Sequence, residues 1–185
     1  NGAPEFDAQG KLKYPLHGKV ANLPAYKVAT SVDSNNDGIR VEGWVEEARF
    51  KFLKLELHSA VTTKLESTEI CIHDTVTNTS DTVAEFQLLY HINFGTPILE
   101  AGAEVFAPVK TLVPRTHRAE QGVAEWSKIA APETGYLEQV YFMELLGNAD
   151  GKSQVLLRNA AGTLGVSVHF NLTQLPCFTF WKNTA

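Results

Sequence analysis

The chain has 185 residues, which is enough for one domain with a substantial core. Its net charge of −5 argues against nucleic acid or an anionic membrane as the partner, because both are bound by a concentrated basic face. No apolar run approaches the roughly 20 residues of a membrane-spanning helix. We therefore expect a cytoplasmic protein.

Apolar and polar residues alternate with a period of two along most of the chain, which predicts half-buried β-strands. In chain order, strands are predicted at 39–45, 50–57, 65–76, 82–94, 136–145, 154–158, 164–170 and 177–181. Segments rich in Asn, Asp and Gly separate them and predict turns. Residues 119–129 are predicted to form a short helix or a loop. Short strands at this spacing predict an all-β chain built as an antiparallel β-sandwich.

No segment predicts a metal site. Residues 33–38 resemble the start of a calcium-binding loop, but Trp44 occupies the twelfth position, where such a loop needs a bidentate glutamate. A hairpin turn is the better interpretation. Cys71 and Cys177 both lie in apolar runs, so we expect buried free thiols rather than a disulfide.

His91 is the leading candidate for acid–base chemistry. It lies in a strongly aromatic, strand-like segment that ends at Gly95 and Pro97, and a histidine held on a sheet can donate or accept a proton near neutral pH. His17, far upstream beside Gly18, is the second candidate. The other histidines occur singly and are expected to be surface or hydrogen-bonded residues.

A further candidate is Glu138, which lies among aromatic residues near the start of a predicted strand that also holds Tyr141. A carboxylate beside tyrosine at a strand end can bind sugar hydroxyls.

The sequence resembles the galactose mutarotase (aldose 1-epimerase) superfamily, and most of all an uncharacterised bacterial branch of it. The segments that carry the resemblance occur in the family's order over nearly all of the chain. They are an early His-Gly motif at 16–25, an Asp-x-x-x-Asn turn at 74–78, the histidine strand at 90–95 and a late aromatic strand at 175–183.

The resemblance implies a large twisted sandwich, a single domain over 1–185, and an isomerase of carbohydrate metabolism that acts on the anomeric centre of a hexose without a cofactor. His91 would protonate the ring oxygen, His17 would hydrogen-bond the same region, and a base would remove the proton at the anomeric position. Glu138 falls where the family has a substrate-binding aspartate. Asn93, Tyr141 and Trp181 are also expected to contact the sugar.

The chain departs from the family pattern at both ends. The family's base is a glutamate several residues or more beyond the late strand, and this chain stops at Ala185. The family's first strands would precede Asn1. We therefore expect a domain that is incomplete at both termini and is completed by missing segments or by a second chain.

Two alternatives remain open at this stage. The first is a carbohydrate-binding or sensing domain that keeps the sugar site and performs no chemistry. The second is a structural β-sandwich, in which His17 and His91 would be far apart or buried without a shared cleft.

Overall fold

A computed structural model describes residues 4–33, 38–49 and 53–184. The chain divides into two units, residues 1–91 and 92–185, and each is described by itself.

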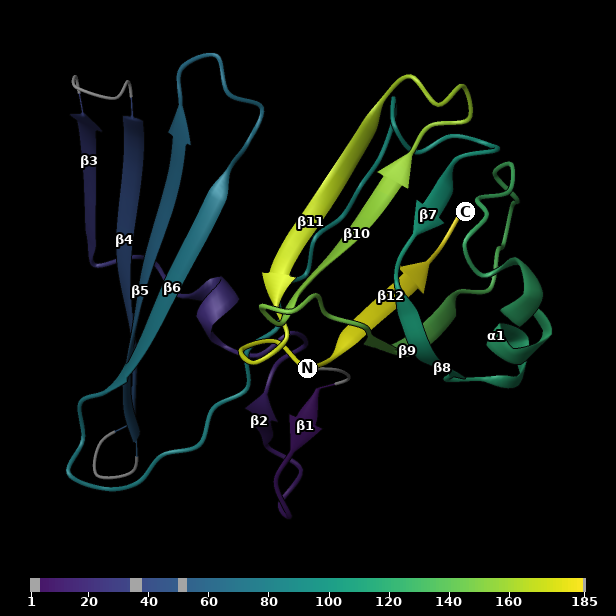
Figure 1. Ribbon diagram of the computed structural model, residues 1–185. Helices are drawn as coiled ribbons and strands as arrows, with labels where there is room; N and C mark the ends of the chain where they lie inside the picture. The colour runs from purple at the N-terminus through teal and green to yellow at the C-terminus, as the bar shows by residue number, and fades with distance from the viewer. Residues whose placement is uncertain (1–3, 34–37, 50–52, 185) are drawn as a thin grey trace. The chain divides into compact units, whose positions relative to one another are not determined.

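The main sheet of the first unit has four antiparallel strands in the order β3–β4–β5–β6 (Figure 1). The strands are β3 (Lys27–Asp33), β4 (Gly38–Arg49), β5 (Leu53–Lys64) and β6 (Cys71–Asn78). Before them come a small hairpin of β1 (Glu5–Phe6) and β2 (Leu12–Tyr14) and the short 3-10 helix η1 (Val20–Asn22). β-Branched residues recur in both long strands, at Ile39, Val41 and Val45 of β4 and at residues 61–63 of β5, and favour the extended conformation.

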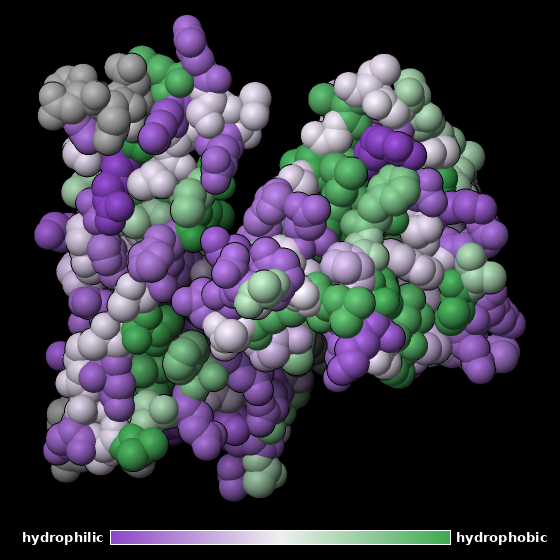
Figure 2. Space-filling view, viewed as in Figure 1, coloured by the Kyte–Doolittle hydropathy of each residue, from purple (hydrophilic) through white to green (hydrophobic). Residues whose placement is uncertain are grey.

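The register gives this sheet one polar and one apolar face. Trp44 lies between Lys27 and His58 on the polar face, with the indole stacked on the His58 ring at a centroid distance of 4.4 Å and the Lys27 ammonium 4.3 Å from the indole centroid. The opposite face carries a row formed by Val41, Val61 and Ile72. All three apolar side chains are exposed. Figure 2 shows apolar side chains reaching the surface among polar ones.

The second unit contains two three-stranded antiparallel sheets, β11–β10–β7 and β12–β9–β8. Its strands are β7 (Glu104–Phe106), β8 (Val109–Pro114), β9 (Gln139–Leu145), β10 (Lys152–Arg158), β11 (Gly165–Asn171) and β12 (Phe178–Lys182). The helix α1 (His117–Gln121) and the 3-10 helix η2 (Val123–Glu125) connect β8 towards β9.

Side chains from both sheets of the second unit form one hydrophobic core. Tyr141 and Met143 of β9 are buried in one cluster with Val105 of β7 and with Val155 and Leu157 of β10. Half-buried aromatic residues of β11 and β12 pack against the cluster, and Phe170 stacks on Phe178 at 5.9 Å. The two sheets therefore form a small sandwich within this unit.

The structure confirms the all-β, antiparallel prediction. Most predicted strands agree with observed ones to within a few residues, and a short helix does form within 117–125. The strands β1, β2, β3, β7 and β8 were not predicted. Part of the strand predicted at 50–57 and the turn at 34–37 lie outside the described residues, although Asp33 pairs with Gly38 as a hairpin requires.

Two strand predictions were wrong, one of them entirely and the other in its extent. The strand predicted at 82–94 does not form, because that segment joins no ladder, and Val83 and Phe86 are exposed. The strand predicted from residue 65 begins only at Cys71. A turn precedes it, in which Ser67 N donates to Lys64 O and Glu66 has a left-handed φ of 61°.

The burial predicted for the two cysteines was also wrong. Both thiols are free and exposed. Cys71 pairs with Thr62 and so lies on the polar face of the sheet, whereas Ile72 points to the apolar face. Cys177 precedes the first residue of β12.

The chain divides into two units, and nothing in the structure tests whether residues 1–185 form one domain. That assignment therefore stays a prediction.

Over the described ranges, no helix has the length and apolar character needed to span a membrane.

Candidate functional site

His17 lies in a tight turn. Gly18 N donates to Pro15 O at 3.0 Å, which closes a four-residue turn with His17 at its third position. His17 has a φ of 65° and Gly18 a φ of 80°. A left-handed backbone is natural for glycine but uncommon for histidine, and such conformations cluster at functional sites. The turn leaves the His17 side chain exposed.

His91 follows a tyrosine that is tied to the sheet. Tyr90 Oη donates to Asp74 Oδ2 at 2.7 Å, and Asp74 lies in β6 on the apolar face. Burial, together with the Asp74 carboxylate, raises the pKa of Tyr90. Asp74 Oδ1 is buried and accepts no hydrogen bond from the residues that the structure describes. This tether fixes the chain next to His91 although residues 82–94 form no strand.

The two histidines meet within the first unit. The ring centroids of His17 and His91 are 5.0 Å apart, and the rings are inclined at 70°, edge to face. Each imidazole is of a kind that can donate or accept a proton near neutral pH, and both side chains are exposed. Their proximity is the arrangement that the structural β-sandwich alternative excludes.

Glu138 and Trp181 meet in the second unit, together with a residue that was not predicted. Trp181 Nε1 donates to Glu138 Oε2 at 2.6 Å, and Arg115 Nη2 donates to Glu138 Oε1 at 2.7 Å. All three side chains are exposed. One donor on each carboxylate oxygen fixes the orientation of Glu138.

The other two residues predicted to contact a sugar, Asn93 and Tyr141, differ from each other in exposure. Asn93 is exposed, near the start of the second unit. Tyr141 is completely buried in the core of that unit, and burial raises its pKa. A sugar has no access to the Tyr141 side chain in this structure.

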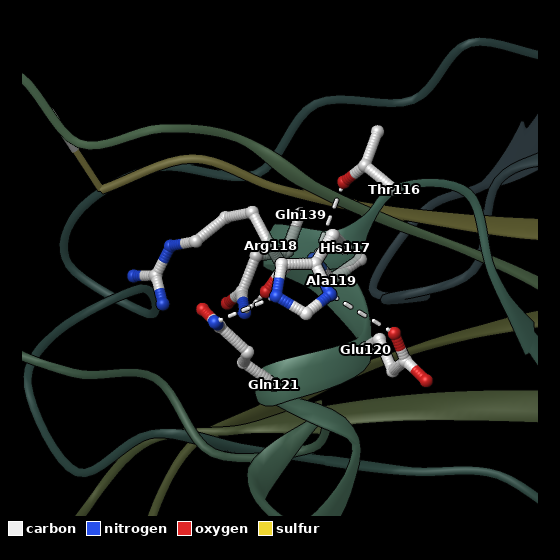
Figure 3. Close-up of polar contacts among 7 residues, drawn as sticks. All are labelled: Thr116, His117, Arg118, Ala119, Glu120, Gln121 and Gln139. Carbon is white, nitrogen blue, oxygen red and sulfur yellow. Dashed lines mark hydrogen bonds and ion pairs between the residues drawn. The ribbon is translucent and has the colours of Figure 1, made fainter.

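A pocket of about 670 Å³ lies beside α1 and η2 in the second unit, and the buried polar side chains of Gln139 and Lys182 that line it bond backbone carbonyls. Figure 3 shows Gln139, whose Nε2 donates to Arg118 O at 3.0 Å, next to α1, which Thr116 caps through Ala119 N. Lys182 Nζ donates to three backbone carbonyls, those of Glu125, Trp126 and Lys128. Gln139 and Lys182 therefore hold α1 and η2 in place beside the pocket.

A search of the described part of the chain for three or more His, Cys, Asp or Glu side chains placed to hold a metal ion finds no such group.

Asp74, Tyr90 and Arg115 were missed as site residues. Asp74 and Tyr90 do lie in the motifs that carry the family resemblance, so the signal was present in the sequence. Arg115 gave no signal, because only the pairing of β8 with β9 brings it beside Glu138, through the bond from Arg115 N to Val140 O.

Comparison with solved structures places the fold in the galactose mutarotase-like superfamily. The crystal structure of a "putative aldose 1-epimerase" from Klebsiella pneumoniae subsp. pneumoniae MGH 78578 matches with a TM-score of 0.94 and 35% sequence identity. The match covers 99% of this chain and 47% of that one, so the chain spans about half the length of the matched protein. A comparison with curated proteins finds no match.

The chain belongs to the family described as domain of unknown function DUF4432, whose model matches residues 1–185.

Proposed function

We propose that the protein of which these residues form part is an aldose 1-epimerase-like enzyme, which interconverts the anomers of a hexose. The observation that carries the proposal is the contact between His17 and His91. These residues lie in the two segments that resemble the superfamily's histidine motifs, and they come together from distant parts of the sequence.

The chemistry needs few groups. In the proposed reaction His91 gives a proton to the ring oxygen as a base removes the proton of the anomeric hydroxyl, and the bond from the anomeric carbon to the ring oxygen breaks. Rotation of the open aldehyde and reversal of both proton transfers close the ring on the other face. His17, in contact with His91, would orient its imidazole and hydrogen-bond the same region of the sugar. The base is not assigned to a residue of this chain.

The test is anomer exchange followed by NMR, starting from freshly dissolved α-D-galactose and α-D-glucose with the full gene product. The wild type is expected to shorten the time to anomeric equilibrium. His91→Gln is expected to reduce that acceleration about 10²- to 10⁴-fold, the usual worth of a general acid. His17→Gln should lower it by a smaller factor.

His169→Gln serves as the control. The side chain of His169 is exposed in the second unit and pairs with Ser167 of the same strand. It should exchange anomers at the wild-type rate. Wild-type acceleration by His91→Gln would contradict the assignment of the acid. Sugar binding without any acceleration would favour the carbohydrate-binding alternative over the enzyme.

A further inference from the structure

Strand β3 forms one edge of the four-stranded sheet of the first unit (Figure 1). It pairs with β4 without interruption from Lys27 to Asp33, and no described residue outside β4 joins it by a ladder or an isolated bridge. Six of its seven residues are exposed, among them Val28 at 64% and Val32 at 73%. A strand edge presents a row of backbone N–H and C=O groups that can pair with a further strand.

The edge of β3 lacks the features with which proteins usually block such pairing. Proline, β-bulges and charged side chains along the strand are common examples. The edge strand β8 of the second unit has a register shift between Val109 and Thr111 and ends in Pro114. By contrast, β3 contains no proline, keeps one register along its whole length and carries charged residues only at its two ends. Its edge is therefore open to another strand.

The sequence of β3 is complementary to itself in the antiparallel direction. A twofold axis at Thr30 places Val28 opposite Val32 of a second copy, and Lys27 opposite Asp33. Directly opposed side chains lie on the same face of a sheet. The valines therefore meet on the apolar face, and the lysine meets the carboxylate on the polar face. The twofold axis repeats each of these contacts.

We propose that β3 pairs antiparallel with β3 of a second copy of the same protein, about a twofold axis at Thr30. The two four-stranded sheets join into one continuous antiparallel sheet. Backbone hydrogen bonds hold the two edges together, and the Lys27–Asp33 contacts set the register, since every other register separates these two residues. The pairing goes beyond the proposed anomer exchange and does not depend on it.

Charge favours this orientation of the second copy. In a parallel pairing Lys27 would lie beside Lys27, and Asp33 beside Asp33, and like charges directly opposite each other are destabilising. The Lys27 ammonium lies over the Trp44 ring, and its flexible four-carbon stem lets it reach the neighbouring strand on the other side. Asp33 has other contacts as well, but a carboxylate offers about four acceptor positions and can accept from Lys27 in addition.

The interface is small, so we expect a dimer that dissociates on dilution. Each copy contributes seven residues, compared with about 20–30 in a typical stable complex. Sedimentation velocity of the full gene product from about 1 µM to about 100 µM measures the association. A monomer throughout this range would overturn the proposal.

Charge reversal tests the register. Lys27→Asp replaces attraction by repulsion at both symmetric contacts and should weaken the dimer at least about tenfold. The double variant Lys27→Asp with Asp33→Lys should restore association, because opposite charges face each other again. Lys54→Asp is the matched control, since Lys54 is exposed in the central strand β5 of the same sheet and should leave the dimer unchanged. Equal association of Lys27→Asp and Lys54→Asp would overturn the register.

A cysteine at position 30 tests the axis directly. Directly opposed antiparallel residues have Cα atoms about 4.5–5.5 Å apart, which is within the range of a disulfide. Replacing Cys71 and Cys177 by serine first removes the two exposed thiols of this chain. Thr30→Cys in that background should then form a covalent dimer under dissolved oxygen.

Val61→Cys is the control for the cross-link. Val61 is exposed in the same row of the apolar face as Thr30, two strands from the edge. It should stay monomeric under the same oxidation. A covalent dimer through position 61 and none through position 30 would show that the copies associate by their faces, and would overturn the pairing of the β3 edges.

Discussion

Tyr90 and Asp74 hold the candidate acid in place. The hydrogen bond from Tyr90 Oη to Asp74 Oδ2, 2.7 Å long, ties the residue before His91 to strand β6. Since residues 82–94 form no ladder of their own, this side-chain bond does what strand pairing does elsewhere in the molecule.

We predict that Tyr90→Phe destabilises the protein by about 1–3 kcal/mol, because it removes the hydrogen bond to a carboxylate whose Oδ1 is buried. Urea unfolding measures the change, and anomer exchange should slow in parallel as His91 loses its anchor. The control is Tyr26→Phe, since Tyr26 bonds Glu56 at an exposed site and should cost less than about 0.5 kcal/mol. Equal effects of the two substitutions would refute the special role of Tyr90.

The same bond has an alkaline signature. Burial and Asp74 raise the pKa of Tyr90 above its ordinary value of 10.0, so the unfolded chain loses this proton first. The contribution of Tyr90 to stability is therefore fully present below pH 10 and declines as the pH rises above it. We expect the free energy of unfolding to fall less steeply above pH 10 in Tyr90→Phe than in the wild type.

The sequence predicted most of the long strands because their alternation is local. It failed at 82–94 because a strand also needs a partner edge, and no local pattern reveals whether one is available. The same limit applies to the site. His17 and His91 were identified through motifs. Their contact depends on a left-handed backbone at His17, which the sequence did not predict. Arg115 was missed because strand pairing, not sequence distance, places it beside Glu138.

Tyr141 shows a different limit. Its neighbours in the sequence are typical of a sugar site, but strand alternation puts Tyr141 on the core side of β9 and Phe142 on the outward side. The strand begins only at Gln139, not at residue 136 as predicted. The sequence alone therefore did not fix which residues of the strand face the core and which face outward.

We expect acid to destabilise the first unit through Glu42, which lies on the polar face of its sheet. A hydrogen bond from Arg40, and then one with His58, lowers the pKa of Glu42 below its ordinary value of 4.5. The stabilisation is therefore present above pH 4.5 and lost as the pH falls through the lowered folded-state pKa. Glu42→Gln should make the acid limb of stability against pH shallower. An unchanged acid limb in thermal unfolding would argue against this network.

Lys182 should stabilise the second unit far more than a surface lysine does. It is only 7% exposed, and its ammonium donates to three backbone carbonyls at 3.1–3.2 Å. We expect Lys182→Met to cost about 2–4 kcal/mol, because these carbonyls lose their donor. Lys110→Met, which breaks only an exposed ion pair, should cost less than about 1 kcal/mol in the same urea experiment.

Burial lowers the pKa of Lys182 below its ordinary value of 10.5, so unfolding takes up a proton between the lowered pKa and 10.5. In that window the contribution of Lys182 to the free energy of unfolding increases with pH. The difference in stability between wild type and Lys182→Met should therefore change with pH there. A constant difference would show that the lysine titrates as it does in the unfolded chain.

The structure leaves no room for a side chain at Gly122, and replacing this glycine tests that packing. A Cβ at Gly122 would overlap Gln139 Nε2 and lie 2.7 Å from Tyr141 Oη, and both side chains are buried. Because neither can move freely, Gly122→Ala should destabilise by about 1–3 kcal/mol. A Cβ at Gly95 meets no atom within 4 Å in the described structure, so Gly95→Ala is the matched substitution and should be nearly neutral. Thermal unfolding of the two variants should separate them clearly. If Gly122→Ala unfolds at the temperature of Gly95→Ala, the close packing of α1 against β9 is not present in solution.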